Sequence, residues 1–162
     1  MSEPASTIEH RLIACLSEQC RALHAMRDLL EQERSALIDR DADALLELAR
    51  GKDALRDRLV QLENTRTELL AGCGAPIDPS AQSQWFSQPD RSPAVRQGWA
   101  EFLATLREAR SRNYANGALL AEQQRMTQQS LRFLQGHADS MAVYGDRGRQ
   151  VSAPMRRMLG TA

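Results

Sequence analysis

Leucines recur every seven residues in two successive stretches of the chain. At 3.6 residues per turn, such a series occupies one narrow face of a helix, as in helices that pack side by side in a bundle. We therefore expect helices over about residues 7–38 and 42–71. The two series are Leu16, Leu23, Leu30 and Leu37, then Leu48, Leu55, Leu62 and Leu69.

An acidic segment at residues 39–43 separates the two series. Leu37 and Leu48 are eleven residues apart, which also keeps them on one face of a single straight helix, so periodicity allows either a turn or a continuous helix. A continuous helix would be about 98 Å long at 1.5 Å per residue. Asp41 and Asp43 suit an N-cap and first turn. We favour a tight hairpin, and the continuous helix remains the alternative.

Charged side chains occupy two places in the row that accompanies the second leucine series. Lys52 and Arg66 have long apolar stems that can cover a seam while the charged ends reach water. We interpret both as residues at the edge of the seam.

Glycine and proline mark a linker over residues 72–92. Gly72 and Gly74 supply stop signals for the second helix, and Asp78-Pro79 favours the start of a short helical turn that carries Trp85 and Phe86. We expect these two aromatic side chains to plug one end of the bundle, and partner binding by the pair is the alternative.

A third helix is predicted over residues 93–135. Ser92 is suited to the N-cap position, Pro93 to the first helical position, and Gly136 to a stop. This helix is the longest of the three, so its broadly apolar C-terminal part would have no partner within the bundle. Residues 1–137 would then form the bundle, and residues 138–162 a flexible tail.

Composition narrows the fold class and the function. Aromatic residues make up 4% of the chain, and 21 basic side chains balance 21 acidic ones. Strong helix formers dominate and β-branched residues are few, which favours an all-α fold. We expect an elongated, coiled-coil-like antiparallel three-helix bundle. The neutral charge argues against nucleic acid as a partner.

Neither cofactor nor catalytic chemistry is indicated. Cys15, Cys20 and Cys73 form no CxxC pair and suggest free thiols in a reducing cytoplasm. Cys20 and His24 have a spacing that could place two metal ligands on one face, but the sequence offers no further ligand nearby. With no phosphate-binding loop and no nucleophile motif, we expect no enzyme, no cofactor and no metal site. No apolar run is long enough for stable membrane insertion.

A polar stretch interrupts the third helix at residues 113–117. Asn113, Asn116 and Gly117 are poor helix formers, so we interpret them as a structural motif. Asn113 and Gly117 extend the row that begins with Leu103 and Leu106. We expect Asn113 to hydrogen-bond across the seam and Gly117 to allow another helix to come close, and direct partner binding by this stretch is the alternative.

Four segments over about residues 12–149 together resemble the FlgN-type flagellar export chaperones. The third and fourth of them, in that order, are the more specific. They are Leu29-Leu30-Glu31-Gln32-Glu33-Arg34-Ser35-Ala36-Leu37 leading to Arg40-Asp41; the run ending at Lys52 with Leu55, Leu59 and Leu62; Asn113-Tyr114-Ala115-Asn116-Gly117-Ala118-Leu119-Leu120; and Tyr144-Gly145 followed by Gly148.

The resemblance implies a cytoplasmic chaperone of the flagellar type III secretion system. Such proteins bind the hook-filament junction proteins FlgK and FlgL and deliver them to the export gate protein FlhA. We expect an amphipathic client segment to bind the end of the third helix and the tail, with Tyr144 also contacting the gate. The sequence is also compatible with a weak homodimer. The alternative function is a homo-oligomeric coiled-coil scaffold without a client. The expected client-binding residues are Leu131, Phe133, Leu134, Met141, Val143 and Tyr144.

Overall fold

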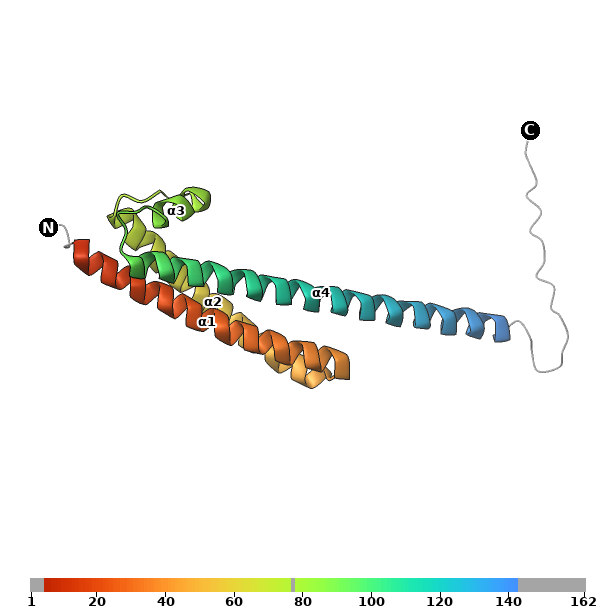
Figure 1. Ribbon diagram of the computed structural model, residues 1–162. Coiled ribbons are helices and arrows are strands. Elements are labelled where there is room, and N and C mark those ends of the chain that lie inside the picture. The colour runs from red at the N-terminus through yellow and green to blue at the C-terminus, as the bar shows by residue number, and fades with distance from the viewer. Residues whose placement is uncertain (1–4, 77, 143–162) are drawn as a thin grey trace, which may run out of the picture. The chain divides into compact units, whose positions relative to one another are not determined.

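The helices end close to where the capping and stop signals lie in the sequence. A computed structural model describes residues 5–76 and 78–142, with the backbone alone for residues 5, 6, 79 and 136–142. These residues form four helices and no strand, which confirms the all-α prediction. The helices are α1 (Ala5–Asp39), α2 (Ala42–Gly72), α3 (Pro79–Phe86) and α4 (Pro93–Ala142) (Figure 1).

The chain divides into two units within α4. The first unit comprises residues 1–119 and the second residues 120–162. The predicted boundary near residue 137 stays a prediction, because residues 143–162 lie outside the described range.

Within the first unit, α1 and α2 run antiparallel. Near the start of α1, the Cys15 thiol donates to the carbonyl oxygen of Leu62 at 3.3 Å. Near its end, Glu33 pairs with Lys52 of α2. A Cβ added to Gly51 would come within 3.1 Å of the Leu29 side chain, so glycine allows the two helices to approach closely here.

The first part of α4 runs parallel to α1 and therefore antiparallel to α2. Gly98 lies beside Leu16, and further along both helices Asn116 contacts Leu30. The three long helices of this unit thus follow an up-down-up order.

A tight hairpin joins α1 to α2, as the sequence favoured. Arg40 adopts a left-handed conformation with φ 56°. Its N–H bonds the Leu37 carbonyl at 3.3 Å, and the N–H of Asp41 bonds the Ala36 carbonyl at 3.0 Å, the two bonds of a Schellman motif. The Asp41 carboxylate then accepts from Ala44 N and caps α2. One residue thus closes the first helix and opens the second.

The linker signals also act as predicted. Gly74 has φ 65° and ends α2 in a second Schellman motif. Asp78 caps α3 with Pro79 in its first turn, and Ser92 Oγ accepts from Val95 N at the start of α4.

The predicted end of the third helix at Gln135 is wrong, because α4 continues through Gly136 to Ala142. A glycine inside a helix costs about 1 kcal/mol relative to alanine, which is too little to stop a long helix by itself. Termination at glycine requires the left-handed cap geometry, as Gly74 shows.

The core follows the first leucine series closely and the second only in part. All four leucines of the first series are buried, whereas in the second Leu62 and Leu69 are buried and Leu48 and Leu55 are half-buried. Burial in α2 is therefore concentrated in its C-terminal half.

Aromatic side chains close the end of the bundle near α3. Phe86 is fully buried and stacks on Trp99 with ring centroids 4.2 Å apart, and Trp85 meets Phe86 edge to face at 5.1 Å. Burial of both Trp85 and Phe86 confirms the predicted plug and contradicts partner binding by this pair.

Candidate partner-binding site

One buried amide joins α4 to α1. Asn116 is 4% exposed, and its Nδ2 donates to the Leu30 carbonyl oxygen at 2.7 Å and to Glu33 Oε2 at 2.9 Å. A buried amide group is costly unless it is hydrogen-bonded. Asn116 therefore specifies which residues of α1 lie opposite it.

The Glu33 carboxylate extends this contact to α2. Glu33 Oε1 accepts from Lys52 Nζ at 2.5 Å, and the two side chains are 15% and 24% exposed. Glu33 thus binds Asn116 with one oxygen and Lys52 with the other. We call Glu33, Lys52 and Asn116 the polar clamp, and it joins the three long helices of the first unit.

The predicted roles of Asn113 and Gly117 are wrong. Asn113 is exposed and makes no described hydrogen bond across the seam, and a Cβ added to Gly117 would meet nothing within 4 Å. The cause is the phase of α4: its buried face carries a different row, seven residues apart, which we call the core row. The core row consists of Phe102, Ala109 and Asn116.

Arg66 forms a second polar contact that the sequence did not reveal. It is 5% exposed, so its predicted place at the seam edge is wrong. Its guanidinium forms an ion pair with Glu63 and donates to Gln82 Oε1 of α3 at 2.8 Å. It also lies 5.0 Å from the centre of the Trp99 ring and 5.4 Å from that of Phe102. These partners replace the water that the charge loses on burial.

In the second unit, α4 exposes large apolar side chains. Leu131, Phe133 and Leu134 are 53%, 64% and 64% exposed, and Leu120 and Met126 are also exposed. At 100° per residue these five residues fall in a sector of about 160°. We call this sector the apolar face of α4.

The charged residues of this segment lie outside the apolar face. Glu122 pairs with Arg125 at 2.7 Å, and Arg132 shares their side of the helix. A helix with one apolar and one charged side is suited to binding another amphipathic surface.

The other predicted client-binding residues are not described in the same detail. Met141 belongs to the backbone-only part of α4, and Val143 and Tyr144 lie outside the described residues. Their roles stay predictions.

The described segments offer neither a membrane span nor a metal site. No helix among them is long and apolar enough to cross a bilayer. Within those same segments, no three His, Cys, Asp or Glu residues gather in a way that could hold a metal ion.

Comparison with known proteins identifies the family. No curated protein and no solved structure matches the chain. The family model described as FlgN protein matches residues 1–152, which include the polar clamp and the apolar face of α4. This family comprises flagellar export chaperones and not enzymes. The all-helical bundle and the match over most of the chain's length show that the chain belongs to the FlgN family.

Proposed function

We propose that the protein binds FlgK and FlgL in the cytoplasm, prevents their premature association and delivers them to FlhA. The observation that supports this proposal is the apolar face of α4, whose leucines are more than half exposed at Leu131 and Leu134. Solvent-exposed leucines on one helix face are suited to an amphipathic client segment. While that segment is bound, its own apolar stripe is covered and cannot associate with another client. Binding alone accomplishes this, without nucleotide hydrolysis.

The client site is tested by removing its leucines. Full burial of a leucine contributes about 1.5–3 kcal/mol, so the loss of two half-exposed ones should weaken binding about thirtyfold. The variant Leu131→Ala/Leu134→Ala should show this loss in calorimetry with a C-terminal FlgK fragment.

A matched control changes two exposed polar residues outside the apolar face, Gln128→Ala/Gln129→Ala. This control should bind the fragment as the parent does, and both variants should keep the parent circular dichroism spectrum. Unchanged affinity of the leucine variant for FlgK and FlgL fragments would refute the assignment.

Delivery is tested separately at Tyr144. We assign this residue to the contact with FlhA, so Tyr144→Ala should reduce binding of the client-loaded chaperone to the FlhA cytoplasmic domain. Tyr114, which is 81% exposed and belongs to the first unit, supplies the control substitution Tyr114→Ala. Equal FlhA binding by both variants would remove Tyr144 from the gate contact.

Light scattering with and without the FlgK fragment separates this function from a scaffold. A chaperone should be a monomer or weak dimer that forms a defined complex with the fragment. A stable oligomer that is indifferent to the fragment would establish the scaffold instead.

A further inference from the structure

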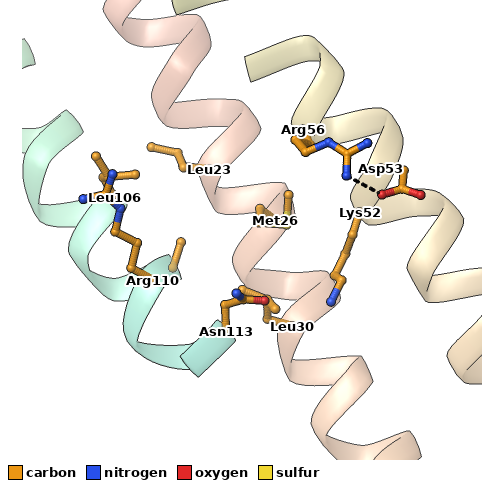
Figure 2. A pocket seen from close by; sticks show the side chains of 10 residues that line it. Leu23, Met26, Leu30, Lys52, Asp53, Arg56, Leu106, Arg110 and Asn113 are labelled. Atoms are coloured by element: carbon orange, nitrogen blue, oxygen red, sulfur yellow. Dashed lines mark hydrogen bonds and ion pairs between the residues drawn. The ribbon is translucent and has the colours of Figure 1, made fainter. Parts of the chain in front are cut away.

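A groove runs along the first unit between α2 and α4, with α1 as its floor. Figure 2 shows Leu23, Met26 and Leu30 of α1 between residues of α4 and residues of α2. This hollow has a volume of about 350 Å³, and it adjoins a second hollow of about 460 Å³ that extends to Trp99. We call the two together the α2–α4 groove.

The α4 wall of the groove carries a row of residues at helix-seam spacing. These residues differ from the core row: Leu103 and Leu106 are half-buried, whereas Arg110, Asn113 and Gly117 are exposed. Asn113 lies at one end of the first hollow, and one helical turn further on the space beside Gly117 is open. A row with the spacing of a bundle seam is therefore left without a helix of this unit against it.

Two buried polar atoms in the wider hollow lack partners. Gln19 and Trp99 are 1% and 6% exposed, and both line this hollow. Gln19 Nε2 donates to Glu63 at 3.2 Å, but Gln19 Oε1 and Trp99 Nε1 make no hydrogen bond. Ordered water commonly satisfies buried groups of this kind, so the two atoms mark unfilled hydrogen-bonding capacity beneath the groove.

Charge indicates the chemistry of the occupant. Arg56 of α2 and Arg110 of α4 line both hollows, and no carboxylate among the described residues pairs with Arg110. The basic C-terminal segment of this chain, with four arginines over residues 147–157, would add like charge. The other cations of the lining are already paired within the chain, Lys52 with Glu33, Arg56 with Asp53 and Arg66 with Glu63, so Arg110 is the cation available to a carboxylate of the occupant.

We propose that the α2–α4 groove is the docking site for one amphipathic helix of a partner protein, with carboxylates beside its apolar stripe. From Trp99 to Asn113 the groove spans about 21 Å of α4, the length of about four helical turns. The apolar stripe packs on Met26, Leu103 and Leu106, and a carboxylate pairs with Arg110. This site is distinct from the apolar face of α4, and its test does not depend on whether that face binds a client.

Two synthetic helices of about 16 residues test the proposal with the full chain. Both have the same leucine stripe, and glutamates flank the stripe in one and lysines in the other. The glutamate peptide should bind at least about tenfold more tightly by calorimetry. Equal affinities, or no binding of the glutamate peptide at about 1 mM, would overturn the proposal.

Variants locate the binding. Arg110→Glu should weaken the glutamate peptide about tenfold, whereas Arg107→Glu, an exposed control on the same helix, should leave its affinity unchanged. Asn113→Trp should obstruct the groove, and because Asn113 is exposed the bundle should still fold. Loss of peptide binding in Leu131→Ala/Leu134→Ala, with binding retained in Arg110→Glu, would place the peptide elsewhere.

Sedimentation of the same proteins tests a second copy as the occupant. The parent chain should sediment identically to Asn113→Trp. A parent dimer that Asn113→Trp dissociates would assign the groove to self-association and overturn the partner proposal.

Discussion

Replacement of Asn116 by alanine tests whether the polar clamp stabilises the bundle. The substitution removes the hydrogen bonds from Nδ2 to the Leu30 carbonyl and to Glu33. It leaves no uncompensated charge, because Glu33 retains Lys52. The loss should therefore be that of two hydrogen bonds and a small volume of packing.

The expected magnitude follows from the partners. A hydrogen bond between neutral groups contributes about 1 kcal/mol net, and one to a charged group about 1.5–3 kcal/mol. Asn116→Ala should therefore lower the free energy of unfolding by about 3 kcal/mol, which corresponds to about 10 °C in melting temperature for a chain of this size.

Urea unfolding followed by circular dichroism measures this change. The midpoint should fall while the slope with urea stays constant, because the exposed area changes little. Asn113→Ala is the matched control, since the same side chain three residues earlier is exposed and should cost less than about 0.5 kcal/mol. Equal stabilities for Asn116→Ala and Asn113→Ala would refute the clamp as a source of stability.

Two further substitutions and two measurements on the cysteines probe other features. Arg40→Gly should stabilise the chain by about 0.5–1 kcal/mol in urea unfolding, because a side chain at φ 56° is strained; a loss of stability would contradict this. Arg66→Ala should destabilise it by about 3 kcal/mol in the same assay, because it removes a buried cation from its partners, and a change below about 1 kcal/mol would argue against that network. Burial raises the pKa of the Cys15 and Cys20 thiols above the ordinary value of 9.0. Burial raises the pKa of Cys73 as well, so exposure sets the order of reaction, and the thiol reagent DTNB should modify exposed Cys73 before buried Cys15 and Cys20. Because the folded-state pKa of the buried thiols is the higher one, their contribution to stability should be constant below about pH 9 and decline as pH rises further; a rise in stability there would contradict the shift.

Helices and their ends could be predicted from the sequence because local chemistry determines them. Asp41, Gly74, Asp78 and Ser92 act through backbone groups within a few residues of themselves. The leucines at seven-residue spacing likewise identify one face of the helix to which they belong. The predicted stop at Gly136 is wrong because a glycine inside a helix differs from a cap only in backbone conformation, which the sequence does not specify.

The faces of α4 could not be assigned in this way. Leucines at 103 and 106 made their row the natural choice for the core, yet Phe102, Ala109 and Asn116 face α1 and α2. The two rows lie less than a quarter turn apart, so the choice depends on where the neighbouring helices are. The burial of Arg66 has the same origin: its partners Gln82, Trp99 and Phe102 come from α3 and α4.

The polar clamp specifies one register of α4 against α1. Val95, Phe102 and Ala109 are buried and repeat with the seven-residue spacing of the core row, so a shift of α4 by one heptad could place an apolar residue at every position of that row. Such a shift of about 10 Å would move Asn116 away from Leu30 and Glu33 and bring Ala109 to its position. Leucines alone would not discriminate between the two registers, whereas a buried amide with fixed partners does. The clamp therefore favours the register in which Asn116 lies opposite Leu30 and Glu33.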